Sequence, residues 1–236
     1  MKVEGKQPKP ERIPPMNFMV FDGETCNTPK IDGQLDVKNG QVYDLGGAII
    51  DEYGNEKARF SVVNEDVFFG MPEQMESAYY ADKIPQYLED MRMGYHKIVD
   101  TWGMYNLVKE LCKRYDVKAM VAHNARFDIQ TLNATMRYQT KSRKRYFFPY
   151  GMKVIDSLKL ARKVFGSDPQ YIAFCQENGY MTKHSIPRPQ LTAEVLWRYI
   201  SNNNDFVESH TGLKDVEIEK EIFTKCLEAL RTKASR

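Results

Sequence analysis

The order of strand-like and helix-like segments constrains the fold more than any other feature of this sequence. Three strand-like segments come first, and a turn signal at residues 52–55 joins the second to the third. Helices and strands then alternate, and helices end the chain. This order predicts an α/β fold in which a mixed sheet of five strands is flanked by helices. The predicted strands are 17–25, 43–51, 58–64, 118–122 and 154–155, and the predicted helices 101–115, 125–138, 158–165, 170–177, 191–200 and 214–234.

Composition and length favour a globular chain with its own core. The 236 residues are 42% hydrophobic and 12% aromatic, which excludes a disordered protein. No apolar run approaches the ~18 residues that a membrane helix needs. Residues 1–15 hold charges and four prolines without an apolar stretch, so we expect a flexible leader rather than a secretory signal. Residues 16–236 are expected to form a single domain, with residues 65–100 as an insertion containing one or two short helices.

The four cysteines are far apart and form no CxxC pair. This spacing argues against a zinc site and a dense disulfide framework, and it favours a reducing compartment and a cytoplasmic location. The formal net charge of +2 says little about partners.

The distribution of charge along the chain is more informative. Residues 129–155 contain no Asp or Glu, and their six Lys and Arg side chains alternate with aromatic rings. Such a segment suits single-stranded nucleic acid, because cations follow phosphates and rings stack on bases. In the alternative interpretation, Phe147 and Phe148 pack onto the core. The candidate substrate-binding residues in residues 137–153, a second substrate-side insertion, are Arg143, Lys144, Arg145 and Tyr146.

Two carboxylates, Asp22 and Glu24, lie two residues apart at the end of the first predicted strand. Side chains two apart on a strand share a face, and on this face Phe18 and Val20 precede them. Two carboxylates on a buried face are costly unless a charge such as a divalent cation compensates for them. The alternative is a pair of solvated acids at a strand end, because matches to such a short motif are common.

Two further acids occur at helix starts. Asp128 borders the apolar side of its helix, although it could simply interact with the helix dipole. Asp215 falls within about 60° of the buried face of the last helix and is expected to point at the sheet, although a capping role is the alternative. His210 is placed on the loop before this helix, with Gly212 permitting a bend.

Three segments, taken in order, resemble the motifs of the DnaQ-like DEDDh exonucleases of the ribonuclease-H-like superfamily. These segments are FDGET at 21–25, HNARFD at 123–128 and HTGLKD at 210–215, and the resemblance extends over about residues 18–230. The position four before Asp215 is Thr211, which disfavours the sister branch with Tyr there. The first motif departs from the family, which often has Gly soon after the Glu-Thr pair, where this chain has Cys26 and Asn27.

The resemblance implies a metal-dependent 3′–5′ exonuclease. It assigns two divalent cations, Mg²⁺ or Mn²⁺, to Asp22, Glu24, Asp128 and Asp215, and it assigns the general base to His210. Thr25 and Asn124 are expected near the terminal nucleotide. We expect His123 to orient the site rather than to bind metal.

The expected partner is single-stranded nucleic acid, with DNA favoured over RNA and no membrane. A replication or repair polymerase is a candidate protein partner. An exoribonuclease or oligoribonuclease of the same family is one alternative. A non-catalytic module that binds nucleic acid or docks on a polymerase is another. The complete set of four carboxylates and His210 favours an enzyme over this module.

Overall fold

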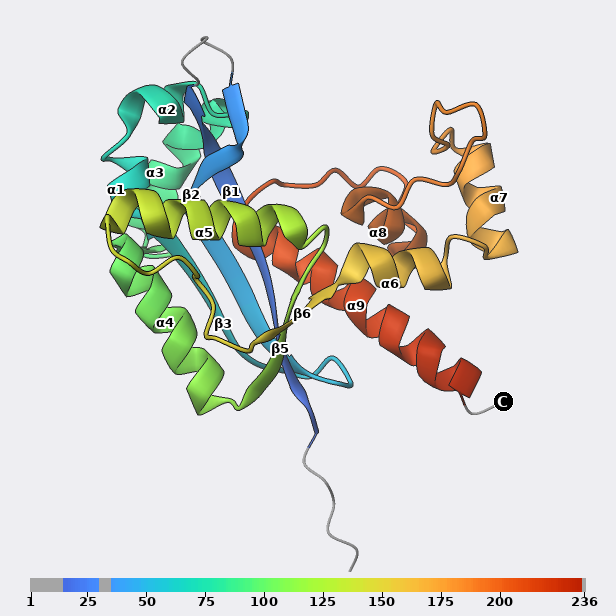
Figure 1. The fold of residues 1–236 in the computed structure, drawn as a ribbon. Helices are drawn as coiled ribbons and strands as arrows, with labels where there is room; N and C mark the ends of the chain where they lie inside the picture. Colours follow the sequence, from blue (N-terminus) through green and yellow to red (C-terminus); the bar gives the residue numbers. More distant parts are fainter. Residues whose placement is uncertain (1–14, 30–34, 235–236) are drawn as a thin grey trace, which may run out of the picture.

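The computed structural model describes residues 15–29 and 35–234, and its centre is a six-stranded sheet in the order β4-β3-β2-β1-β5-β6 (Figure 1). The first three strands form an antiparallel meander, and β5 and β6 run parallel to β1. The strands are β1 (Asn17–Pro29), β2 (Leu35–Asp51), β3 (Glu56–Asn64), β4 (Lys97–Val99), β5 (Val117–Ala122) and β6 (Lys153–Asp156).

The predicted α/β class and mixed sheet are confirmed, but the sheet has six strands rather than five. The additional strand, β4, lies at the edge parallel to β3. Its three residues are too few to show a periodic pattern in the sequence. The predicted leader lies outside the described residues except for Pro15. Within the described ranges, no helix is long and apolar enough to cross a membrane.

Nine α-helices occur in the described part of the chain, together with a single 3₁₀ turn η1 at Ala81–Lys83. Asp100 caps α4, since its side chain accepts a hydrogen bond from the amide of Gly103 at 2.6 Å. The helices are α1 (Glu65–Phe68), α2 (Pro72–Glu76), α3 (Ile84–Arg92), α4 (Thr101–Arg114), α5 (Arg126–Thr140), α6 (Ser157–Val164), α7 (Pro169–Glu177), α8 (Ala193–Ser201) and α9 (Gly212–Ala234).

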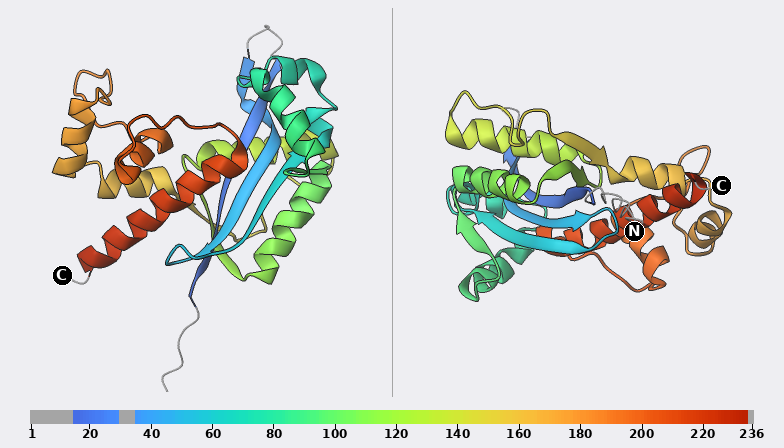
Figure 2. Two further views of the ribbon diagram at one scale, coloured as in Figure 1. Left: turned by 180° about the vertical axis from the view of Figure 1, so that it is seen from behind. Right: turned by 90° about the horizontal axis from the view of Figure 1, so that it is seen from below.

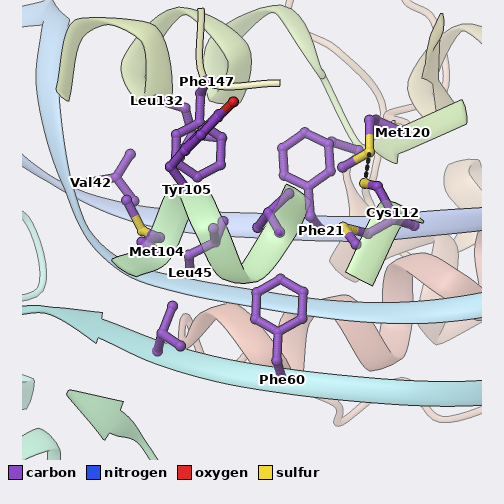
Figure 3. Packing of buried hydrophobic residues seen from close by; sticks show 14 of the residues in the cluster. Phe21, Val42, Leu45, Phe60, Met104, Tyr105, Cys112, Met120, Leu132 and Phe147 are labelled. Carbon is purple, nitrogen blue, oxygen red and sulfur yellow. Dashed lines mark hydrogen bonds between the residues drawn. The ribbon is translucent and has the colours of Figure 1, made fainter. Parts of the chain in front are cut away.

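Helices cover both faces of the sheet. One face packs against α4 and α5, and Figure 3 shows this core with Phe21, Leu45 and Phe60 of the sheet, Met104 and Tyr105 of α4, and Leu132 of α5. The basic segment contributes Phe147, which is fully buried, and Phe148, whose ring centroid lies 4.9 Å from that of Phe21. These two rings therefore belong to the core, as the alternative interpretation proposed.

The opposite face packs against α9. Phe18 and Val20 of β1 share a buried cluster with Val216 and Phe223 of α9. Because side chains alternate along a strand, Asp22 and Glu24 lie on the same face of β1 as Phe18 and Val20. This face points to the beginning of α9.

Two accessory groups of helices complete the molecule. Helices α6, α7 and α8 share a second core with α9 and form a lobe beside the sheet (Figure 2). Helices α1, α2 and α3, from the predicted insertion, pack over the ends of β1 and β2 through Tyr43, Phe68 and Tyr87. The insertion is therefore part of the folded body. The predicted carboxylates Asp22 and Glu24 lie within β1 rather than at its end, because the strand continues to Pro29.

Candidate active site

All five residues predicted to form the catalytic site line one cleft with a volume of about 1220 Å³. Three elements and one loop supply them. The list is Asp22 and Glu24 from β1, Asp128 from the first turn of α5, Asp215 from the first turn of α9 and His210 from the loop before α9.

The start of α9 reaches the carboxylates of β1 because two glycines allow backbones to touch. Gly46 pairs with Asp22 in the sheet, and a Cβ added to Gly46 would lie 2.2 Å from the carbonyl carbon of Gly212. A Cβ on Gly212 would in turn lie 2.7 Å from the Gly46 nitrogen. Any side chain at either position would therefore push the first turn of α9, which carries Asp215, away from the sheet.

A buried carboxylate of β2 also fixes the start of α9. Oδ2 of Asp44 accepts hydrogen bonds from the Gly212 amide at 2.9 Å and from the Tyr87 hydroxyl at 2.7 Å. Asp44 is completely buried, and its other oxygen has no hydrogen-bond partner among the described residues. A negative charge at this position interacts favourably with the positive end of the helix dipole.

Glu24, His210 and Asp215 form a group suited to a cation. One ligand atom from each side chain lies within 4.8 Å of the others. Asp215 therefore reaches the edge of β1 that carries Glu24. Carboxylate oxygens are the ligands that Mg²⁺ prefers, and no cysteine lines the cleft.

The cleft concentrates buried negative charge. Burial raises the pKa of Asp22 to about 7, with Glu208 and Asp44 adding repulsion. Burial also raises the pKa of Glu24 to about 10 and that of Asp215 to about 8. For both residues, repulsion from the charge of Asp22 makes the second largest contribution to the increase. Divalent cations relieve such crowding by compensating for several carboxylates at once.

Asp128 belongs to the same charged group. Its residue is 4% exposed, and its pKa is raised first by burial and then by the charge of Asp22. The main-chain amide of Gly23 opposes this shift by stabilising the ionised carboxylate. The alternative interpretation, in which Asp128 only interacts with the helix dipole, does not account for a side chain that is buried beside Asp22.

His210 is held by two residues of the predicted insertion. Its ring stacks on Tyr80 with centroids 4.4 Å apart, and the Lys83 ammonium donates hydrogen bonds to the carbonyls of Ser209 and His210. Burial lowers the pKa of His210, and the charge of Lys83 lowers it further. The ring is therefore kept neutral near neutral pH, as a general base requires.

The bend before α9 differs from the prediction. We expected Gly212 to supply it, but His210 itself adopts a left-handed conformation with φ of 48°. Gly212 is instead the first residue of α9, where the absence of a side chain permits its contact with β2. The sequence could not distinguish these roles, because the contact joins residues far apart in the chain.

His123 uses both of its ring nitrogens in the wall of the cleft. Nε2 lies 2.7 Å from the carbonyl oxygen of Leu191, and Nδ1 lies 3.0 Å from the Ser157 hydroxyl. A carbonyl can only accept, so Nε2 carries the proton, and Nδ1 is left as an acceptor that faces the Ser157 hydroxyl. Neither nitrogen is directed to a cation, in agreement with an orienting role.

Two further acids line the cleft that the sequence did not single out, Glu208 and Glu219. Glu219 lies within α9. It follows Asp215 by one helical turn, is 4% exposed, and lines the cleft. Its Oε2 accepts a hydrogen bond from the main-chain amide of His123 at 3.2 Å, and its pKa is raised by burial and by Asp22 and Asp128. A separation of about 40° from Asp215 around the helix was the signal available in the sequence.

The predicted substrate-binding residues are distributed over different surfaces. Asn124 lines the cleft, whereas Thr25 follows a register shift of β1 and is not among the residues that line it. Lys144 turns back onto α4, with its ammonium 3.9 Å from the centre of the Tyr105 ring. Arg145 and Tyr146 line a separate groove, and Arg143 is exposed.

Comparisons with known proteins find similarity in structure only. No protein-family model and no curated protein matches the sequence. A 3′-exonuclease described as recognising the 3′ end of a histone mRNA stem-loop superposes with a TM-score of 0.54 and 12% identity, over 91% of this chain and 64% of that protein. Exonuclease I of E. coli superposes with a TM-score of 0.54 and 12% identity, over 92% of this chain and 43% of that protein.

The chain therefore has the ribonuclease-H-like fold of these exonucleases. This confirms the predicted fold class and a resemblance to exonucleases at the level of fold. The chain spans less than two thirds of the length of both proteins.

Proposed function

We propose that this protein is a 3′–5′ exonuclease that removes nucleotides from single-stranded DNA with the help of two divalent cations. One observation carries the proposal. Acidic side chains from three distant segments and the ring of His210 line a single cleft, in a fold shared with two exonucleases. E. coli exonuclease I has been solved with a dA16 oligonucleotide, which supports a DNA strand as substrate.

The residues present fit a pair of hard cations. Asp22, Glu24, Asp128 and Asp215 would hold them, because all four are carboxylates directed into one cleft. Cations bound there supply compensation for the charge of the phosphate and acidify a bound water. His210 accepts the proton of the attacking water, since its lowered pKa leaves the ring neutral near neutral pH. Lys83 and Tyr80 keep that ring in place.

A second candidate is an exoribonuclease with the same site. The observation that favours it is the equal structural similarity to the 3′-exonuclease described with a histone mRNA stem-loop. Discrimination between the two sugars depends on contacts to the 2′-hydroxyl.

The test is digestion of 5′-labelled and 3′-labelled strands of DNA and RNA in Mg²⁺ or Mn²⁺. We expect the 5′-labelled DNA strand to shorten progressively and the 3′ label to be released first. Asp22→Asn and Asp128→Asn should each lose at least ~10³-fold in rate, because each removes a cation ligand.

Asp116→Asn is the matched control. Asp116 is 76% exposed in its side chain and has a φ of 48°, which Asn also tolerates. Turnover of the two cleft variants at the rate of this control would contradict the proposed site. Retained strand binding by the wild type without cleavage in either cation would favour a binding module.

A further inference from the structure

A second groove adjoins the active-site cleft on the outer side of α5. Its volume is about 660 Å³, and its walls come from α5, the segment before β6, β6 itself and α6, elements that can be located in Figure 1. The first turns of two helices separate the two hollows. In α5, Phe127 lines the cleft and Arg126 the groove, and in α6, Leu158 lines the cleft and Lys159 the groove. The two hollows therefore open next to each other.

The groove is strongly basic. Its lining holds a single acid, Asp156, and four cations, which are Arg126, Arg137, Arg145 and Lys159. Oδ1 of Asp156 is already engaged by the amides of Asn124 at 3.3 Å and Leu158 at 3.1 Å. Its Oδ2 lies 3.6 Å from the Lys159 ammonium. Asp156 thus accepts hydrogen bonds from amides at the starts of α5 and α6, and it compensates for the charge of one of the four cations, Lys159.

The three arginines lack acidic partners in the described parts of the chain. The side chains of Arg126 and Arg145 form no hydrogen bond or ion pair there, and the side chain of Arg137 donates only to a carbonyl of its own helix, that of Asn133 at 3.3 Å. All three residues are exposed. An arginine fork without a carboxylate partner is well matched to a phosphate, which accepts two parallel hydrogen bonds.

An aromatic ring and an apolar strip accompany the charges. Tyr146 is 68% exposed, and Ile129 and Val154 form an apolar part of the wall. Cations combined with an exposed ring are typical of grooves that bind single strands, where phosphates follow the charges and bases stack on the ring. An acidic peptide would use the charges but would leave the ring without a planar partner.

We propose that this groove binds the part of a nucleic-acid strand that lies on the 5′ side of the nucleotide held in the cleft. The inference rests on the proposed function, because it takes the cleft as the site of the 3′ end. A strand that leaves the cleft past Asn124 enters the groove directly. The enzyme consequently prefers strands long enough to occupy both hollows over dinucleotides, which occupy the cleft alone.

The test compares KM for a dinucleotide with KM for a strand of about 12 nucleotides, a length within the usual range of single-strand sites. The groove variant combines Arg126→Gln, Arg137→Gln and Arg145→Gln. The matched control removes three charges from the exposed side of α4, with Lys109→Gln, Lys113→Gln and Arg114→Gln.

We expect the groove variant to raise KM for the long strand at least ~10-fold more than KM for the dinucleotide. The slope of log KM against log salt for the long strand should fall by about 2, since three phosphate contacts to a single strand are lost. Tyr146→Ala should weaken binding of the long strand on the order of tenfold, and Tyr146→Phe should restore it, because stacking needs only the ring.

Two results would overturn the inference. One is a groove variant that behaves like the α4 control with both substrates. The other is an unchanged affinity for the strand together with lost binding of a polyglutamate peptide, which would assign the groove to an acidic protein. If the wild type cleaves neither substrate, the proposed function fails. Fluorescence anisotropy with the same labelled strand and the same variants then still decides whether the groove binds nucleic acid.

Discussion

At the scale of single residues, the charge of Lys83 tunes the proposed base. Lys83 lowers the pKa of His210, so Lys83→Met should raise that pKa. A base with a higher pKa is protonated over a wider acidic range. The acidic limb of the kcat/KM profile is therefore expected to move to higher pH, as measured on a short DNA substrate. Lys83→Arg retains the charge and should leave the limb near its original position, whereas an unshifted limb in Lys83→Met would contradict the coupling.

Glu219 offers a second test at the same scale. Glu219→Gln removes an ionisable carboxyl group from the cleft, while the amide oxygen of Gln can still accept the hydrogen bond from His123. We expect the affinity for Mn²⁺ to fall about 10- to 100-fold, the usual effect of losing a supporting group at a metal site. Titration calorimetry with Mn²⁺ measures it. Glu228→Gln, on the exposed part of the same helix, is the control, and equal affinities in the two variants would leave Glu219 a structural residue.

At the scale of secondary structure, the contact between α9 and β2 positions the site. In Gly46→Ala the new Cβ would overlap Gly212, so the start of α9 must move and carry Asp215 away from Glu24. Overpacking of this kind costs about 1–3 kcal/mol of stability, and a displacement near 1 Å lowers kcat on the order of 10²-fold. Urea unfolding and single-turnover rates report the two effects.

Gly47→Ala separates stability from positioning. A Cβ at Gly47 would lie 2.3 Å from the Phe60 ring, on the face of the sheet that packs against α4 and α5. We expect this variant to be destabilised while its folded fraction keeps the wild-type rate. Equal losses of rate in both variants would show that strain in β2, and not the place of α9, limits catalysis.

The elements also show which parts of the site were predictable. The alternation of Phe18, Val20, Asp22 and Glu24 predicted a row that runs from the core into the cleft, and the structure places this row against α9. The periodicity of a strand or a helix involves residues that are close in the chain, so it can be recognised in the sequence. The bond from Lys83 to the loop at Ser209 joins residues 126 positions apart, and no local pattern encodes such a contact.

At the scale of the whole molecule, the sheet, the insertion and the α6–α8 lobe meet around one cleft that is rich in acidic residues. Residues from all three line the cleft, among them Asp22, Tyr80 and Arg162. The folded protein raises the pKa of Asp22 from 3.8 to about 7 and that of Asp215 from 3.8 to about 8. The folded state thus holds these protons more tightly than the unfolded chain, and its stability depends on whether they remain bound.

The sign of that dependence predicts how pH and cations act together. Stability conferred by a raised carboxyl pKa is fully present below about pH 4 and is lost as pH rises through about 7 to 8. The unfolding temperature of the protein in EDTA should therefore fall progressively as the pH is raised from about 4 to about 8. Mg²⁺ or Mn²⁺ replaces the protons, so the stabilisation by cation should grow with pH in thermal unfolding curves. Asp22→Asn combined with Asp215→Asn should flatten the profile in EDTA and abolish most of the cation effect. Wild-type profiles that run parallel with and without cation would show that the carboxylates of the cleft do not bind it.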